Sequence, residues 1–372
     1  MKNIDITQLR LQNQHLINSD IQNPADVVSG LGAVQAQDYA GAKWAVGQRT
    51  VGAKDKSIEQ AFNEGNILRT HVMRPTWHFV SPADIRWILQ LTAPRVHAAN
   101  AYMYRTLELD KAIFKHSQAV LEKALRDGKH LTRAELTSVL KQAGIFSNNL
   151  LRFTYLIMRA ELDGLICSGP RRGKQFTYAL LEERVPKAKE MSRNEALAEL
   201  LKRYFATRGP ATLQDFVWWS GLTMADVKSG VELIKSQLVN ERLNGQTYWF
   251  SESRSSPKEK SPTAYLLPNY DEYFIGLKDR SAIRDVVRQS KLPENSPSLI
   301  AYVIILDGQI VGEWKRTLKK DSVIVELNLI TSLTNAEDRA VTVAAERYAA
   351  FLELPVDLRS AAASTQTAQR LR

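Results

Sequence analysis

Apolar residues at helical spacing alternate with short β-rich stretches along the first part of the chain. Asn23 and Pro24 begin a predicted helix as its N-cap and first residue, and helical spacing returns over residues 39–48 and 57–64. Residues 67–80 are then rich in β-branched and aromatic side chains. This pattern predicts a group of helices followed by a β-hairpin.

The same order of helices and a hairpin recurs twice further along the chain. In each recurrence a threonine precedes an acidic residue by three positions, Thr132 with Glu135 and Thr212 with Asp215, which is the spacing of a capping box. The hairpin of the second copy encloses the turn-forming loop 168–174, which carries three positive charges. Helices followed by a basic hairpin are typical of a winged helix, so the repetition predicts three such modules in tandem.

The pattern changes to that of a sheet in the last third of the chain. Residues 299–306 and 322–329 are rich in Val, Ile and Leu, and Asp307-Gly308 has the composition of a hairpin turn. A helix is predicted over residues 335–354, after these strands. The C-terminal part is therefore expected to be a small β-sheet with a final helix.

We expect a mainly α protein with β elements (α+β) and several modules, because 372 residues exceed one ordinary core. The polar, proline-containing stretch 251–262 is expected to be a mobile loop. The predicted boundaries are 1–81 for the first winged helix, 82–190 for the second, 191–262 for the third, 263–357 for the C-terminal sheet and helix, and 358–372 for a disordered tail.

Composition narrows the class of protein. The chain is 44% apolar and 24% charged, which is typical of a soluble globular protein. No stretch has the apolar length of a signal peptide or a membrane span, so we expect a cytoplasmic protein without membrane contact. Cys167 is the single cysteine, which excludes an internal disulfide, a zinc knuckle and a cysteine-ligated iron–sulfur cluster. The net charge of +10 favours a polyanionic partner.

The motifs of common hydrolases are absent from the sequence. The six histidines are scattered, and there is no phosphate-binding glycine loop, Gly-x-Ser-x-Gly turn or paired-histidine zinc motif. Gln35-Ala36-Gln37 is more informative, because in an extended segment its two amide side chains point the same way and can hold one water between them. The alternative interpretation is a polar helix end with solvated glutamines.

Five segments resemble the AlkZ/YcaQ family of winged-helix DNA glycosylases in their order and spacing. They are GAVQAQD, WAVGQR, LRTHVMRPTWHFV, FVWWSGL and LLPNYDEYFIGLKDR. The resemblance extends from about Thr7 to about Val356. It implies three tandem winged helices and a C-terminal β-barrel around a basic channel for double-stranded DNA, in a monomeric bacterial enzyme without a cofactor.

A Gln-aliphatic-Gln motif marks the AlkZ-like branch of that family, and a Gln-aliphatic-Asp motif marks the other branch. Gln35-Ala36-Gln37 resembles the first motif. This resemblance implies excision of bulky N7-alkylguanines and extends to the unhooking of interstrand crosslinks. An N7-alkylguanine is already cationic and leaves without a general acid, so two neutral amides need only orient the attacking water.

Candidate DNA-binding residues come from the resembling segments and from the basic loop. Alternation places Arg74, Thr76 and His78 on one face of the first hairpin, and the alternative is that Thr76 and His78 are core polar residues. The charges of loop 168–174 suit phosphate contact, and the alternative there is a solvated loop tip. The full set is Arg49, Arg69, His71, Arg74, Thr76, His78, Arg171, Arg172, Lys174 and Arg280.

Two further groups allow two interpretations each. Trp218 and Trp219 are adjacent, so at most one faces a core, and packing is favoured over base stacking. Asp271, Glu272 and Arg280 either form a structural ion-pair group or approach the active site.

The sequence thus predicts a monofunctional DNA glycosylase of DNA repair that hydrolyses the N-glycosidic bond of alkylated guanines, with Gln35 and Gln37 as catalytic residues. The alternative is a non-enzymatic winged-helix DNA-binding protein, such as a transcriptional regulator. A third possibility is a nucleic-acid enzyme that acts on RNA. The glutamine pair favours a glycosylase, because a regulator has no need of it near DNA.

Overall fold

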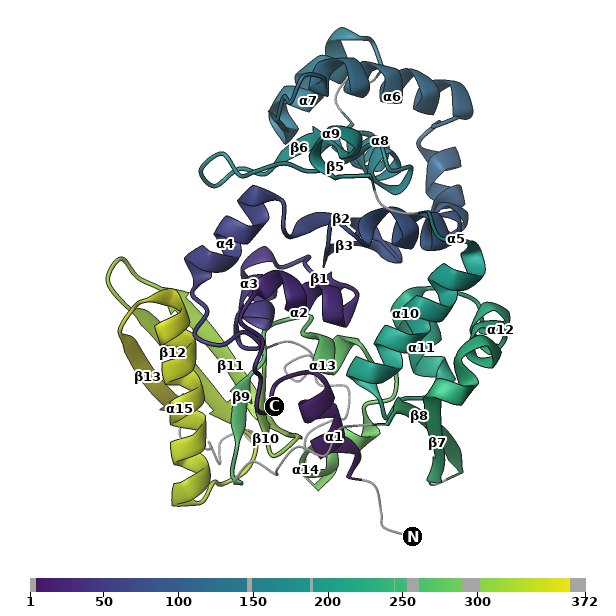
Figure 1. The fold of residues 1–372 in the computed structure, drawn as a ribbon. Helices are drawn as coiled ribbons and strands as arrows, with labels where there is room; N and C mark the ends of the chain where they lie inside the picture. Colours follow the sequence, from purple (N-terminus) through teal and green to yellow (C-terminus); the bar gives the residue numbers. More distant parts are fainter. Residues whose placement is uncertain are drawn as a thin grey trace, which may run out of the picture.

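The computed structural model describes residues 5–145, 149–187, 190–243, 245–252, 261–289 and 302–361 (Figure 1). Helices and strands are mixed along the chain, as the α+β prediction required. Residues 253–260 of the predicted loop, 299–301 of a predicted strand and 362–372 of the predicted tail lie outside the described residues.

The first group of elements forms the centre of the molecule. It comprises α1 (Ile6–Asn13), α2 (Pro24–Leu31), β1 (Val34–Gln35), α3 (Tyr39–Gly47), α4 (Asp55–Glu64), β2 (Leu68–Val72) and β3 (Arg74–Val80). The strands form an antiparallel sheet in the order β1-β3-β2. The predicted start of α2 is confirmed, because the Asn23 side chain accepts from the backbone N–H of Ala25.

The second group contains two helices that the sequence pattern did not reveal, α5 (Ile85–Thr106) and α6 (Lys111–Leu125). They precede β4 (Leu131–Thr132), α7 (Arg133–Gln142), α8 (Leu150–Leu162), β5 (Ile166–Ser168), β6 (Thr177–Leu180) and α9 (Leu181–Arg184). The capping box of Thr132 and Glu135 is present at the start of α7. The sheet order is β4-β6-β5, so the predicted hairpin is confirmed.

The third group begins with a further unpredicted helix, α10 (Arg193–Arg208). It continues with α11 (Leu213–Ser220), α12 (Met224–Ile234), η1 (Lys235–Gln237) and the paired strands β7 (Leu238–Leu243) and β8 (Gln246–Ser251). Thr212 and Asp215 form the predicted capping box of α11. Helices followed by a hairpin therefore occur in all three groups, in the predicted order.

The C-terminal group is an open five-stranded sheet, with strand order β13-β12-β11-β10-β9. Its elements are β9 (Ala264–Leu266), α13 (Glu272–Ile275), η2 (Ser281–Ile283), α14 (Asp285–Gln289), β10 (Val303–Leu306), β11 (Gln309–Leu318), β12 (Val323–Leu329), α15 (Asn335–Leu352) and β13 (Val356–Ala361). Asp307 and Gly308 both have positive φ, as the predicted hairpin turn requires. Over the described residues the sheet is half a barrel and does not close.

The predicted disordered tail is wrong at its beginning. Residues 358–361 belong to β13, which pairs with β12 in parallel from Val323 opposite Val356 to Asn328 opposite Ala361. A parallel strand needs a crossover connection, and α15 supplies it. The ladder to β12 orders this segment, and Val356 and Leu358 pack against the apolar core.

The central sheet joins the other groups (Figure 1). The second group lies above β1–β3, the third group lies to the right, and the C-terminal sheet with α15 lies to the lower left. The first group and the C-terminal sheet share one apolar core, in which the rings of Trp44 and Tyr348 approach to 5.1 Å between centroids. These parts are therefore packed together, and α13 also lies close to β1, because Glu272 accepts from the Gln35 N–H. No helix in the described part of the chain is both long and apolar enough to cross a membrane.

Candidate active site

The two glutamines lie where β1 leaves the central sheet. Gln35 is the last residue of β1 and pairs with His78 of β3, and the Ala36 N–H donates to the Trp77 carbonyl at 2.7 Å. Gln35 is buried, whereas Gln37 is exposed and its Oε1 accepts from the Trp77 backbone N–H at 3.3 Å. One glutamine therefore faces the interior and the other faces solvent. The side-chain oxygen of each accepts a hydrogen bond from the first hairpin.

Behind Gln35 a buried carboxylate holds the strand. The Gln35 N–H donates to Glu272 Oε1 at 2.9 Å, and Glu272 Oε2 accepts from Arg208 Nη2 at 2.6 Å and from the Trp219 indole N–H at 3.0 Å. Glu272 and Arg208 are fully buried. Arg208 also donates to the carbonyls of Leu31 and Ala33, which come just before β1. The two members of the ion pair thus hold neighbouring parts of the backbone. Arg208 holds the carbonyls that precede β1, and Glu272 holds the backbone N–H of Gln35.

Arg74 connects Gln35 to the third group of elements. Its Nη2 donates to Gln35 Oε1 at 2.8 Å, and its Nη1 donates to the carbonyls of Trp218 at 3.3 Å and Trp219 at 2.9 Å. Those carbonyls belong to the last turn of α11, where a cation is favoured by the helix dipole. Burial lowers the pKa of Arg74. The guanidinium orients the Gln35 amide, with its oxygen facing Arg74.

His78 is fully buried beside Arg74 and is neutral. Its Nδ1 lies 2.9 Å from the Thr76 carbonyl, which can only accept, so Nδ1 carries the proton and Nε2 faces Arg74 Nη2 at 3.4 Å as an acceptor. Burial, and after it the charge of Arg74, holds the pKa of His78 well below its usual range. Thr76 Oγ1 is buried without a partner among the described residues.

Arg69 and His71 lie on the opposite side of this hairpin, against the second group. The Arg69 guanidinium lies over the rings of Trp77 (4.3 Å) and Phe176 (4.6 Å), and its Nε donates to the Ala36 carbonyl at 3.0 Å. His71 contacts Glu161 through a short hydrogen bond and packs on Trp77. Both residues are buried, so their positions do not fit the predicted direct DNA contacts.

The remaining candidates are divided between the interior and the surface. Arg49 is fully buried and donates to both oxygens of Asp271 at 2.8 Å, which does not fit a contact with DNA. Arg280 is half-buried over the ring of Phe274 and donates to its carbonyl. Asp271 therefore belongs to a structural ion pair with Arg49, whereas Arg280 is held against Phe274.

The predicted basic loop is only partly free. Arg171 packs over the rings of Tyr39 and Phe176, which leaves 15% of its side chain exposed. Arg172 is exposed and pairs with Glu135, and Lys174 is exposed. Two of the three predicted phosphate contacts are thus presented to solvent.

Sequence reasoning missed Arg208. It stands at the end of an unpredicted helix outside the five resembling segments, and nothing in its neighbours marks it as the partner of Glu272. Glu272 itself lies in a resembling segment, and in the structure it contacts the candidate active site through the Gln35 backbone N–H.

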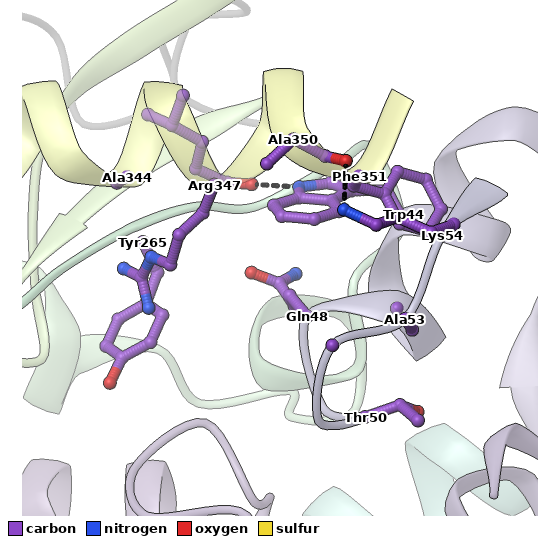
Figure 2. A pocket seen from close by; sticks show the side chains of 13 residues that line it. Trp44, Gln48, Thr50, Ala53, Lys54, Tyr265, Ala344, Arg347, Ala350 and Phe351 are labelled. Atoms are coloured by element: carbon purple, nitrogen blue, oxygen red, sulfur yellow. Dashed lines mark hydrogen bonds between the residues drawn. The ribbon is translucent and has the colours of Figure 1, made fainter. Parts of the chain in front are cut away.

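A cavity of about 200 Å³ lies away from the glutamines, between the end of α3 and α15 (Figure 2). Trp44 and Phe351 form apolar walls, and neither Gln35 nor Gln37 lines it. Its two cationic side chains are engaged, since Arg347 donates to the Ala264 carbonyl and Lys54 Nζ to the Ala350 carbonyl. The described residues contain no cluster of three or more metal-binding side chains there or elsewhere.

Comparisons with known proteins identify the family of this chain. The model of the family described as DNA glycosylase AlkZ-like matches residues 28–351. A relative from Streptomyces sahachiroi, named interstrand DNA cross-link repair glycosylase, is 23% identical over 363 residues that cover 92% of this chain and 93% of the relative. The solved structure of Streptomyces sahachiroi DNA glycosylase AlkZ has the same fold, with a TM-score of 0.76 at 21% identity over 95% of this chain and 98% of that one. The chain belongs to the AlkZ-like DNA glycosylase family and is thus an enzyme that hydrolyses N-glycosidic bonds.

Proposed function

We propose that the protein releases N7-alkylated guanines from double-stranded DNA, with Gln35 and Gln37 orienting the attacking water. The observation that carries this proposal is how the two amide oxygens are held. Each accepts from one donor, Arg74 for Gln35 and the Trp77 backbone for Gln37. A carbonyl oxygen has two lone pairs, so each glutamine retains one for a hydrogen of the water.

In the described part of the chain, the residues around Gln35 and Gln37 offer no free acid, which suits a leaving base that needs no proton. His78 is held neutral, and Glu272 is engaged by Arg208 and the Gln35 backbone. When the bond from C1′ to N9 breaks, its electron pair neutralises the cationic base, while the water oxygen bonds to C1′ and its proton passes to solvent. An ordinary purine leaves as an anion unless an acid protonates it. We therefore propose selectivity for cationic bases.

Binding of the duplex is proposed to involve three winged helices. The helix and hairpin order of the three groups supports these modules, and Arg172 and Lys174 lie exposed on the loop of the second. The name of the Streptomyces relative extends the proposal to crosslinked guanines. The enzyme is proposed to act as a cytoplasmic monomer without a cofactor.

A duplex with one N7-methylguanine tests the function directly. After incubation with the protein, an abasic-site endonuclease cleaves the strand wherever a base has been lost, and the same duplex incubated without the protein measures spontaneous base loss. We expect cleavage at the modified position and an intact control duplex with guanine there. An intact strand under conditions of saturated binding would contradict the proposed activity, and selective binding to one sequence would then favour a regulator.

A further inference from the structure

Trp218 and Trp219 have opposite environments although they are neighbours in α11. Trp219 is fully buried with its indole N–H on Glu272, whereas 43% of Trp218 is exposed. The sequence predicted that this pair packs into a core, and in the structure only Trp219 does so. Trp218 is left as an exposed large aromatic side chain next to the candidate active site.

Two contacts hold Trp218 beside Gln35. Its indole N–H donates to the Ile275 carbonyl at 3.2 Å, at the end of the helix whose first residue, Glu272, holds the Gln35 N–H. Its own carbonyl accepts from Arg74, which donates to Gln35 Oε1. The polar edge of the ring is therefore satisfied by protein, and what remains exposed is apolar ring surface.

The end of α11 is docked tightly against the first hairpin. Gly221 ends the helix with φ of 71°, and a Cβ there would lie 2.5 Å from the Met73 carbonyl. Met73 is the turn residue next to Arg74. This close approach requires glycine and fixes the turn that carries Trp218 relative to the hairpin that carries Arg74.

We propose that Trp218 is a stacking platform for the alkylated guanine, and so a residue that determines specificity. This inference rests on the proposed function. A ring fixed in advance stacks on a base with little loss of conformational freedom, and an indole attracts a cation more strongly than a neutral ring of equal shape. The platform therefore favours the cationic base over unmodified guanine before any bond is broken.

Binding to uncleavable duplexes tests this platform separately from catalysis. One duplex carries 7-methylguanine on a sugar with fluorine at C2′, which withdraws electrons and slows release of the base. A second carries 7-deaza-7-methylguanine, which is neutral and has nearly the same shape, and a third carries guanine. Dissociation constants are measured with the full-length protein and with Trp218→Ala, Trp218→Phe and Tyr102→Ala. Tyr102 is an exposed aromatic residue of α5 and serves as the matched control.

We expect Trp218→Ala to weaken binding of the cationic duplex roughly 10-fold and binding of the neutral and unmodified duplexes by a clearly smaller factor, because those duplexes have no cation–π attraction to lose. Trp218→Phe should restore part of the loss, and Tyr102→Ala should bind as the unmodified protein does. Equal weakening for all three duplexes would overturn the inference and make Trp218 a general DNA contact. Absence of any preference for the cationic duplex in the unmodified protein would overturn it too. Failure of the proposed function has a different signature, namely no base release from ordinary N7-methylguanine DNA.

Discussion

At the scale of single residues, the two glutamines share one proposed water but differ in exposure. Gln37→Ala should slow release of N7-methylguanine by roughly 10²-fold under single-turnover conditions, because a preorganised polar group is lost while folding and DNA affinity are kept. Gln35→Ala should behave similarly. Since both serve one water, the double variant should cost less than the two losses together.

Gln37→Asp is the matched control for this prediction. It keeps an acceptor oxygen at the exposed position and should retain measurable activity, because a carboxylate can both hold the water and stabilise the cationic sugar. Alanine variants that release the base at the unmodified rate would refute the water-positioning role. Loss of DNA binding in each variant would make the pair a contact site.

His78 should make the free energy of unfolding depend on pH. Its folded pKa is lowered well below 6.5, so below that pH the unfolded chain binds a proton that the folded protein does not. Stability from this residue is therefore full above about pH 6.5 and falls with acidification, by up to about 1.4 kcal/mol per pH unit. Urea unfolding at pH 7.5, 6.5 and 5.5, compared with His78→Leu, measures the effect. An identical pH slope in both proteins would contradict it.

Residue chemistry could be predicted from the sequence where it depends on near neighbours. The Gln35-Ala36-Gln37 segment stood out because both amides lie within three positions. The burial of Arg49 could not be predicted, because its partner Asp271 is 222 positions away and only the folded chain brings them together. Arg208 and Glu272 were hidden for the same reason, 64 positions apart.

At the scale of elements, the sequence predicted the features that depend on contacts between residues close together in the chain. The capping boxes at α7 and α11 and the turn at Asp307-Gly308 depend on contacts within a few residues, and they are present. Helix α5 was missed because Pro94 lies inside it, and proline normally ends a helix. Burial of its apolar face, including Trp87 and Ile88, outweighs that cost. Strand β13 depends on its ladder to β12, a contact that its short sequence does not reveal.

The loop of the second group should contribute to DNA affinity through Arg172 and Lys174. Replacing both with Ala should weaken binding to all sequences alike, and should reduce the slope of log affinity against log salt by about 1 per lost phosphate contact. Filter binding at several salt concentrations measures both quantities. Arg171→Ala is the comparison, because this residue packs on Tyr39 and Phe176 and should lower thermal stability instead. An unchanged salt slope in the double variant would remove the loop from the DNA interface.

At the scale of the whole molecule, the ion pair of Arg208 and Glu272 joins three parts of the chain. Glu272→Gln leaves Arg208 buried without its opposite charge, and we expect the free energy of unfolding to fall by about 3–5 kcal/mol. Equilibrium unfolding in urea measures this loss. Glu182→Gln is the control, since Glu182 pairs with Arg86 at the surface, where removal should cost less than about 1 kcal/mol. Equal losses in both variants would contradict the buried pair's role.

The hydrogen bond from Gln35 to Glu272 spans 237 positions of the chain, and this has a consequence for synthesis. A ribosome delivers the N-terminal part first, so both glutamines emerge long before the carboxylate that holds their strand. Helix α1 and its C-cap also lack their partners at that stage. Arg10 donates to the Pro210 carbonyl and Gln14 donates to the Glu272 carbonyl, and both carbonyls are synthesised much later. The candidate active site is therefore assembled late, and a nascent chain that stops before α13 carries both glutamines without the carboxylate that holds the Gln35 N–H. With the catalytic role proposed for the glutamines, base release is expected only from chains whose synthesis has passed that helix.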